Sequence, residues 1–211
     1  EALIASMIAS GPPANRPPHM LFEEVPAMLS SLALRLRRLP AALALYTALG
    51  LSANLAMPLP ALADMAAVAA LREGDMRKLS FHATPRPTPA AVLLDADGGE
   101  HALADWQGRW VVLNFWATWC APCRHEMPSL ERLEAAFGGD AFAVVPVATG
   151  RNPVPAIRRF FDETELVLLP ILRDPTQALA REMGVLGLPV TVILNPAGEE
   201  VARLTGDAEW D

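Results

Sequence analysis

Apolar residues in the second half of the chain fall into continuous runs separated by stretches with helical spacing. Residues 110–116 form a nearly continuous apolar run, which is typical of a central strand that is covered on both faces. Residues 142–148 form a second run of this kind, and residues 167–172 are a candidate for a third strand. After the first run, apolar residues recur at three- and four-residue spacing and predict a helix: Met127, Leu130, Leu133, Ala136 and Phe137.

Two shorter helices and two hairpins complete the predicted elements. Residues 155–161 and 175–183 have helical patterns, and the second pattern stops at Gly184, a residue type that commonly follows a helix end. Strands that alternate with helices and end in a hairpin predict an α/β sandwich with a central mixed sheet. Turns that contain glycine predict the two hairpins, which join residues 91–95 to 101–103 and residues 190–194 to 200–204.

A basic segment followed by an apolar one lies in the first third of the chain. The arginine-rich residues 35–38 precede an uncharged run, rich in alanine and leucine, that extends over residues 39–63. This order, together with the small residues at the end of the run, predicts a secretory signal peptide over 28–63 that is cleaved before Asp64. The run is also long enough to be a membrane anchor. In either case we expect the arginines to stay in the cytoplasm and the chain after Asp64 to cross the membrane.

The composition excludes several classes of protein. With 52% apolar and 19% charged residues, the 211-residue chain is too apolar to be disordered and can form a packed core. A formal net charge of −7 argues against a nucleic-acid partner, because binding to nucleic acid needs a basic face. The presence of two cysteines excludes a scaffold with several disulfides and a four-cysteine zinc site.

Cys120 and Cys123 directly follow the first apolar run, at the start of the predicted long helix. The histidines are scattered, so we do not expect these cysteines to share a zinc ion. Covalent haem attachment requires a histidine directly after the second cysteine, where this chain has Arg124. A structural disulfide would close a very short loop and would stabilise the fold little. A redox-active dithiol fits best, because a helix N-terminus stabilises the thiolate of the first cysteine. We therefore expect no metal and no cofactor.

Two motifs resemble those of the extracytoplasmic thioredoxins of the TlpA/ResA type, which are DsbE-like thiol:disulfide oxidoreductases. Residues 115–128 read Phe-Trp-Ala-Thr-Trp-Cys-Ala-Pro-Cys-Arg-His-Glu-Met-Pro and resemble the active-site stretch of that family. Residues 183–194 resemble its second motif, in which the proline is cis. The resemblance covers about residues 91–210, and the 66 positions between Cys123 and Pro189 fit the family's inserted strand and helix. Residues 151–153 and 206–210 look nearest to the proteobacterial TlpA branch.

The resemblance implies roles for individual residues. Cys120, nearest the helix start, would be the exposed attacking thiolate, and Cys123 would resolve the mixed disulfide. Glu126, on the same helix face as Cys123, would tune the dithiol and pass protons to Cys123, unless it is a solvated helix charge. The substrate-binding residues would be Trp119, Leu188 and Pro189, where Trp119 either covers the site or packs against the sheet, and a cis Pro189 brings Leu188 beside Cys120.

The predicted organisation has four parts. Residues 1–27 precede the signal or anchor segment at 28–63 and remain unassigned, and residues 64–90 form a short helix and a proline-rich linker. Residues 91–211 form a thioredoxin-like redox domain with an N-terminal β-hairpin and an inserted strand and helix. Members of the family continue into a final helix that this sequence lacks, so we expect the chain to be a C-terminally truncated fragment.

The resemblance predicts a periplasmic thiol:disulfide oxidoreductase that acts as a reductant. Its context would be the assembly of c-type cytochromes or of the copper centre of cytochrome oxidase. Its partners would be a disulfide-containing substrate protein and an upstream membrane thiol reductase that supplies electrons. The alternative is a non-catalytic thioredoxin-fold module that handles copper. A peroxidase is disfavoured, because it would use a lone peroxide-reactive cysteine rather than a pair.

Overall fold

The computed structural model describes residues 3, 5–7 and 67–210, so the predicted signal or anchor segment at 28–63 lies outside the described residues. Within the described residues, a mixed sheet has the strand order β1-β8-β7-β4-β5-β6-β2-β3. The strands are β1 (Ser80–Pro87), β2 (Val92–Asp95), β3 (Glu100–Ala102), β4 (Trp110–Trp116), β5 (Phe142–Thr149), β6 (Leu172–Asp174), β7 (Val190–Leu194) and β8 (Glu199–Thr205). The helices after residue 73 are the 3-10 helices η1 (Gly74–Lys78) and η2 (Leu103–Trp106), and the α-helices α4 (Ala121–Phe137), α5 (Val154–Glu163) and α6 (Ala178–Glu182).

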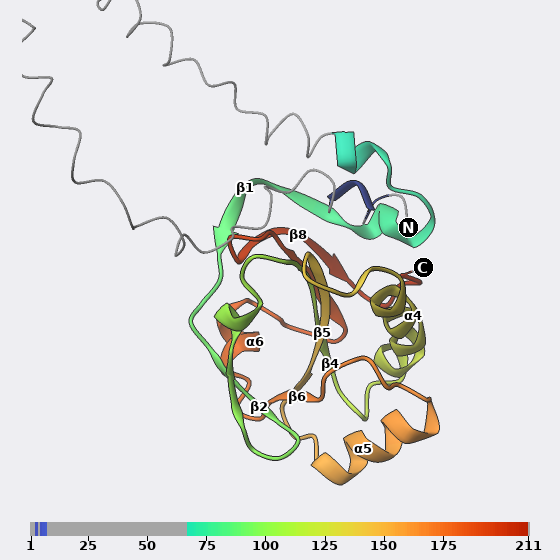
Figure 1. The fold of residues 1–211 in the computed structure, drawn as a ribbon, viewed down its shortest axis with the longest axis vertical. Coiled ribbons are helices and arrows are strands. Elements are labelled where there is room, and N and C mark those ends of the chain that lie inside the picture. The colour runs from blue at the N-terminus through green and yellow to red at the C-terminus, as the bar shows by residue number, and fades with distance from the viewer. Residues whose placement is uncertain (1–2, 4, 8–66, 211) are drawn as a thin grey trace, which may run out of the picture. The chain divides into compact units, whose positions relative to one another are not determined.

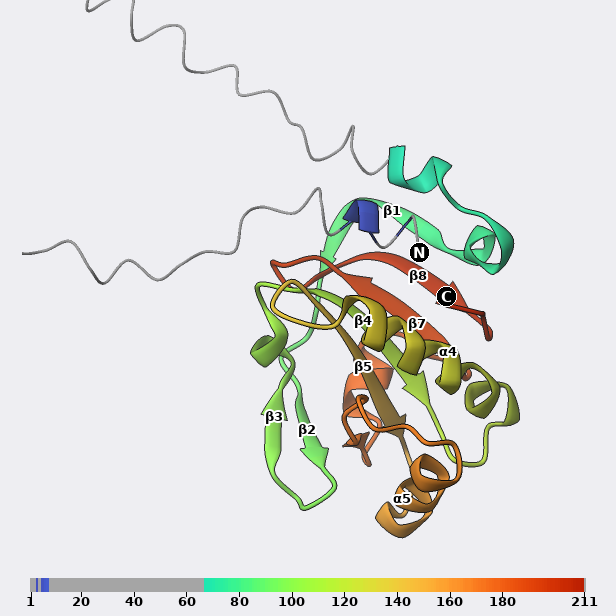
Figure 2. The same cartoon turned by 45° about the vertical axis from the view of Figure 1, so that its right-hand side comes forward.

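Parallel pairing occupies the centre of the sheet. Strand β4 pairs in parallel with β5, which pairs in parallel with β6. On one flank, β7, β8 and β1 continue from β4 with antiparallel pairing. On the other flank, the β2–β3 hairpin joins the sheet through antiparallel pairing of β2 with β6 (Figure 2). The predicted α/β fold with a mixed sheet and both predicted hairpins are therefore confirmed.

Strand β4 is covered on both of its faces, as its continuous apolar run predicts. Helices α4 and α5 lie on one side of the sheet and α6 lies on the other (Figure 1). All seven side chains of β4 are buried. Trp116 belongs to the same core cluster as Met127 of α4, whereas Phe115 belongs to the cluster that contains Leu179 of α6. The end of β4 is therefore a rigid base for the loop that follows it.

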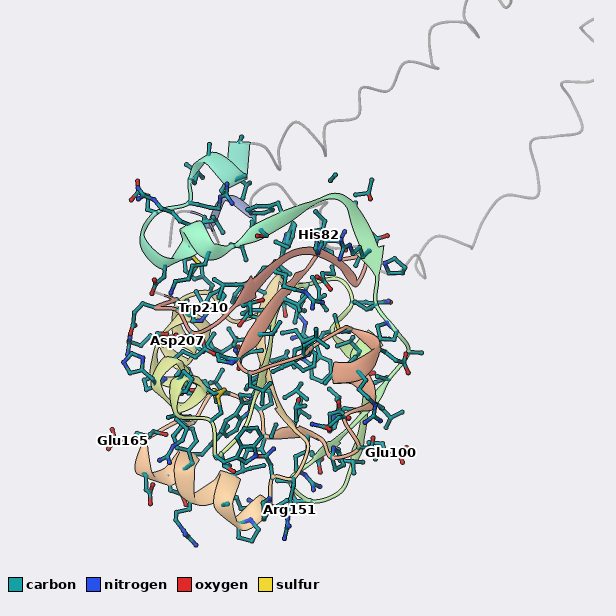
Figure 3. The ribbon with its side chains drawn as sticks, turned by 180° about the vertical axis from the view of Figure 1, so that it is seen from behind. His82, Glu100, Arg151, Glu165, Asp207 and Trp210 are labelled. Atoms are coloured by element: carbon teal, nitrogen blue, oxygen red, sulfur yellow. A yellow bond between two sulfur atoms is a disulfide. The ribbon has the colours of Figure 1, made fainter. Side chains whose placement is uncertain are left out.

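Part of the predicted proline-rich linker is a strand, which corrects the sequence interpretation of residues 64–90. Residues 80–87 form β1 and pair with β8, with a register shift between Phe81 and Arg86. Proline is tolerated there because β1 is an edge strand, where a missing N–H can face away from the sheet. The His82 side chain joins the two strands as well, with Nε2 lying 2.7 Å from Oε1 of Glu200 (Figure 3).

Strand β6 is shorter and begins later than the predicted strand at 167–172. The Glu131 carboxylate on α4 accepts hydrogen bonds from the backbone N–H groups of Val167, Leu168 and Leu169, at 2.9, 2.8 and 3.2 Å. These bonds use donors that a strand would give to its neighbour, and the Val167 side chain is 81% exposed. Helix α6 also begins later than predicted, because the Asp174 carboxylate accepts from the N–H groups of Ala178 and Ala180.

Candidate redox site

Cys120 and Cys123 form a disulfide at the N-terminus of α4, with their Cα atoms 5.3 Å apart. Cys120 is the N-cap residue of α4, and its Sγ accepts a hydrogen bond from the backbone N–H of Cys123 at 3.3 Å. Pro122 stands in the first turn, where a helix does not need the N–H that proline lacks. The helix therefore begins at the cysteine pair, as the sequence predicts.

The two cysteines differ in their access to solvent. Cys120 is 6% exposed and Cys123 is 0% exposed, so Cys120 is the more accessible of the two. In this disulfide form, packing in the core cluster covers most of Cys120. An attacking group must reach the disulfide at Cys120, since nothing reaches Cys123 from solvent.

Two basic side chains follow the pair on α4, and both are exposed. Each also has a partner. The Arg124 guanidinium carbon lies 4.8 Å from the centroid of the Phe160 ring on α5. Nδ1 of His125 lies 3.6 Å from Oδ2 of Asp207. Neither contact directs a positive charge to a cysteine sulfur.

Glu126 is fully buried, so the alternative of a solvated helix charge is wrong. Its Oε1 accepts a hydrogen bond from Nδ2 of Asn114 at 2.8 Å. Its Oε2 accepts from the backbone N–H of Ala208 and from the indole N–H of Trp210, both at 3.2 Å. Burial raises the pKa of Glu126 to about 7, although these three hydrogen bonds oppose the effect and lower it. The carboxyl group is therefore placed to exchange a proton near neutral pH.

Asn114 is a functional candidate that the sequence analysis did not single out. It lies in the middle of β4 with no exposed surface, and Nδ2 also donates to Oγ1 of Thr191 on β7 at 2.9 Å. Its Oδ1 is buried and has no hydrogen-bond partner among the described residues. The sequence did contain a signal for Asn114, because it is a polar residue inside the apolar run at 110–116. A buried polar side chain needs a hydrogen-bond partner, so its position indicates a buried polar contact.

The segment after β8, residues 206–210, closes the site behind Glu126. The labelled Asp207 and Trp210 lie beside α4 in Figure 3. On the side of α4, the backbone N–H of Trp210 donates to Oγ of Ser129 at 3.2 Å. On the side of η1, the backbone N–H of Glu209 donates to Oδ2 of Asp75 at 3.1 Å. Nζ of Lys78, also on η1, donates to the carbonyl of Asp207 at 3.0 Å. Helix α4 and the 3-10 helix η1 therefore fix the donors that reach Glu126.

Asn152 fixes the loop that leads from β4 to the cysteines. Its Oδ1 accepts from the N–H of Thr118 at 2.8 Å and from the Thr118 hydroxyl at 3.0 Å. Its Nδ2 donates to the carbonyl of Thr149 at 2.9 Å. The sequence marked residues 151–153 as part of a resemblance but assigned Asn152 no role, because no local pattern links it to Thr118 across 34 positions.

The Leu188–Pro189 peptide bond is cis, as the resemblance implies. Because Val190 pairs with Phe115, Pro189 lies at the end of the sheet where β4 leads to the cysteines. Leu188 is partly buried and packs against both core clusters, one of which contains Cys120 and Cys123. Trp119 is 67% exposed, so it does not pack against the sheet. These residues surround the end of the sheet that carries the disulfide.

The family model described as the AhpC/TSA family matches residues 85–201, which is more than half of the chain. The chain belongs to the AhpC/TSA family. The thiol-disulfide oxidoreductase ResA of Geobacillus thermodenitrificans is 34% identical over 118 residues, which cover 56% of this chain and 67% of the relative. The Bacillus subtilis ResA is 33% identical over 118 residues, covering 56% of this chain and 65% of the relative. The chain thus spans about two thirds of the length of these relatives.

Solved structures place the fold among the thioredoxin-like proteins. A protein from Chlorobium tepidum, described as a thiol:disulfide interchange protein DsbE, aligns with a TM-score of 0.54 and 26% identity, over 61% of this chain and 89% of its own. The exposed lipoprotein thioredoxin of Streptococcus pneumoniae aligns with a TM-score of 0.51 and 28% identity, over 58% and 93%. With its cysteine pair, the chain is a thiol-disulfide oxidoreductase of the ResA/DsbE type.

Two features are absent from the part of the chain that the structure describes. No helix among residues 3, 5–7 and 67–210 is long and apolar enough to cross a membrane. The same residues contain no group of three or more histidine, cysteine, aspartate or glutamate side chains that could hold a metal ion.

Proposed function

We propose that this oxidoreductase acts as a reductant of disulfides in substrate proteins outside the cytoplasm. The observation that carries this proposal is the buried Glu126 carboxyl group, which lies one helical turn beyond the buried Cys123 on α4. A buried base beside a buried thiol suits the step in which that thiol must lose a proton to become a nucleophile.

The reaction begins with the reduced pair. The Cys120 thiolate attacks one sulfur of a substrate disulfide, forms a mixed disulfide and releases the other substrate sulfur as a thiolate, which takes up a proton. Cys123 then loses its proton to Glu126, and its thiolate attacks Sγ of Cys120. The Cys120–Cys123 disulfide forms, the second substrate sulfur leaves, and it receives the proton. Two electrons pass from the dithiol to the substrate, which becomes a dithiol.

The position of Cys120 favours its role as the attacking residue. The backbone N–H of Cys123 points at its sulfur, and the N-terminus of α4 stabilises negative charge there. Cys123 is fully buried and follows one turn later, which suits a residue that attacks only from within the protein. Trp119, Leu188 and Pro189 would form the surface against which the substrate chain docks.

The direction of electron flow follows from the surroundings of the pair. A strong oxidant stabilises its reduced form by holding a very acidic thiolate. Here the residues between the cysteines are Ala121 and Pro122, whose side chains carry no donor. A negative charge on Glu126 opposes a second negative charge on a nearby sulfur. The disulfide is therefore comparatively stable, and its dithiol is a reductant.

The location and the partners extend the proposal. The segment at 28–63 would carry the redox domain to the periplasm as a signal peptide or an anchor, and one structural relative is described as an exposed lipoprotein. A reductant in an oxidising compartment needs electrons from an upstream membrane thiol reductase. The substrates would be proteins of cytochrome c maturation or of the assembly of the cytochrome oxidase copper centre.

Trapping tests this proposal in the native periplasm. Cys123→Ser leaves Cys120 able to attack but removes the resolving thiol, so mixed disulfides with substrates should accumulate and be released by dithiothreitol. The matched control is Cys120→Ser combined with Cys123→Ser, which should trap nothing. Equal recovery of partners from both variants would contradict the proposed attack, and trapped partners unrelated to metalloprotein assembly would contradict the proposed substrates.

A further inference from the structure

The donors that hold Glu126 come from two places that are far apart in the sequence. Asn114 reaches Oε1 from β4, whereas Oε2 is held by the segment after β8, through the Ala208 N–H and the Trp210 indole. Trp210 stands 84 positions beyond Glu126 and is 3% exposed. A hydrogen bond to a buried carboxylate stabilises the charged form more than a bond between neutral groups.

The position of Trp210 is also fixed by hydrogen bonds that do not involve its indole N–H. Its backbone N–H donates to Oγ of Ser129, and that hydroxyl donates in turn to the carbonyl of Glu126 at 2.8 Å. Because Ser129 lies one turn after Glu126 on α4, the indole ring is anchored to the same helix that carries the cysteines. Loss of the indole N–H would therefore change the charge balance of Glu126 without releasing the segment.

We propose that Trp210 is a positioning residue of the redox reaction: with the Ala208 amide it holds the Glu126 carboxylate, so that the segment after β8 sets the pH at which Cys123 resolves a mixed disulfide. This inference rests on the proposed role of Glu126 as the proton acceptor of Cys123. Trp210 touches neither the substrate nor a sulfur in this account and acts only through Glu126.

Other charged groups near Glu126 must stay constant in the test. Asp207, in the same segment, raises the pKa of Glu126 through its negative charge. Lys78 of η1 is attracted by Glu126, and its own pKa is raised mainly by its hydrogen bond to Asp75. His125 of α4 faces Asp207. Asn114 of β4, which donates to Glu126, and Thr191 of β7, which accepts from Asn114, do not titrate.

The test is the pH dependence of resolution in a single turnover. The reduced protein, mixed with dithionitrobenzoate, releases one thionitrobenzoate when Cys120 attacks and a second when Cys123 resolves. In Trp210→Phe, the pH of half-maximal rate in the second phase should rise by about one pH unit, because the carboxylate loses a donor. At pH 6.5 the second phase should slow several-fold, and the two rates should converge at alkaline pH.

Trp110→Phe is the matched control. Trp110 belongs to the same core cluster and is also buried, but its indole nitrogen has no hydrogen-bond partner among the described residues. Its pH profile should coincide with that of the wild type. If Trp110→Phe shifts the profile as much as Trp210→Phe does, the effect is one of packing and the inference is wrong.

Glu126→Gln separates this inference from the proposed function. The second phase of the wild type should slow as the pH falls below neutrality, and we call this fall in rate the acidic limb. If Glu126→Gln abolishes the acidic limb but Trp210→Phe does not shift its pH, Trp210 does not position Glu126 and only the inference fails. If Glu126→Gln itself leaves the limb unchanged, Glu126 is not the proton acceptor and the proposed mechanism fails with it.

A second measurement uses the wild-type protein and needs no folded variant. In ¹⁵N-labelled protein with the Cys120–Cys123 disulfide intact, the indole N–H resonance of Trp210 should titrate with an inflection near pH 7, because its acceptor gains a proton there. The indole resonance of Trp110 should stay flat through the same range. A flat Trp210 resonance would overturn the inference whatever the variants show.

Discussion

Nδ2 of Asn114 lies 2.8 Å from Oε1 of Glu126, and both side chains are fully buried between β4 and α4. The same nitrogen donates to Thr191, so one amide group joins β4, α4 and β7 behind the cysteine pair. A carboxylate in such a place is costly unless it is hydrogen-bonded or protonated. The Glu126 carboxyl group is stabilised in both ways, because it accepts hydrogen bonds from three donors and its pKa of about 7 allows it to be protonated near neutral pH.

The stability of the oxidised protein should depend on pH through Glu126. Its pKa rises from an ordinary value of 4.5 to about 7 in the folded state, so the folded protein binds this proton more tightly than the unfolded chain does. Stability from this group is therefore full below pH 4.5 and is lost as the pH rises to 7. The loss corresponds to about 3 kcal/mol, measurable by urea unfolding between pH 4.5 and 7.5.

Glu126→Gln is the comparison for this prediction. All three hydrogen-bond partners of the Glu126 side chain are donors, so the NH₂ group of glutamine would meet a donor. The resulting loss of stability does not change with pH, because glutamine does not titrate. Other groups, such as Glu200, titrate in both proteins and contribute equally to each. The contribution of Glu126 is therefore the part of the difference in unfolding free energy that changes with pH. A difference that is flat from pH 4.5 to 7.5 would show that the Glu126 pKa is not raised.

Asn152→Ala should destabilise the oxidised protein by about 1–3 kcal/mol, because it leaves the partly buried N–H of Thr118 and the buried carbonyl of Thr149 without their partner. The loop before Cys120 should also exchange its amide hydrogens faster. Thr118→Val removes one of these hydrogen bonds and should cost less, about 0.5–1.5 kcal/mol. Equal losses in the two variants, or none in Asn152→Ala, would show that Asn152 does not fix the loop.

Limited alkylation of the reduced protein at mildly acidic pH should label Cys120 before Cys123. Cys120 keeps the helix N-terminal position and the N–H donor that favour its thiolate, whereas Cys123 has no exposed surface. Peptide mapping after a short iodoacetamide pulse gives the order directly. Preferential labelling of Cys123 would reverse the assignment of nucleophile and resolving residue.

Trp119→Ala should affect substrate docking and not the fold. Because the side chain is 67% exposed, the free energy of unfolding should change by less than about 0.5 kcal/mol. We expect the KM for a disulfide-containing protein to rise several-fold while the rate with dithionitrobenzoate is unchanged, since a small reagent does not need the docking surface. An equal loss with both substrates would place Trp119 in the chemistry instead.

Local patterns predicted the central strand, the long helix and the cysteine pair. The continuous apolar run at 110–116 predicted a strand buried on both faces, and the cysteines at the start of the next helix predicted the redox pair. The strand and the helix start depend on residues that are close together in the sequence, which is where pattern and propensity act. The cis bond before Pro189 was implied by the resemblance of the second motif to the family.

Features built from distant residues were not predictable in this way. The sequence placed Glu126 on the face of Cys123 but left its environment open, because burial there depends on Ala208 and Trp210 in another part of the chain. The register of β1 against β8 was missed for the same reason, and its prolines suggested a linker. The Glu131 carboxylate, which keeps residues 167–169 out of the sheet, overrode a run with strand composition.

The reduction potential of the Cys120–Cys123 pair tests the central claim most directly. The purified redox domain would be equilibrated with dithiothreitol or glutathione buffers, and its two forms would be quantified by alkylation and mass spectrometry. A reductant should have a potential close to that of thioredoxin, roughly −270 mV. A potential near that of the strong periplasmic oxidant, roughly −120 mV, would mean that the protein donates disulfides and would contradict the proposed function.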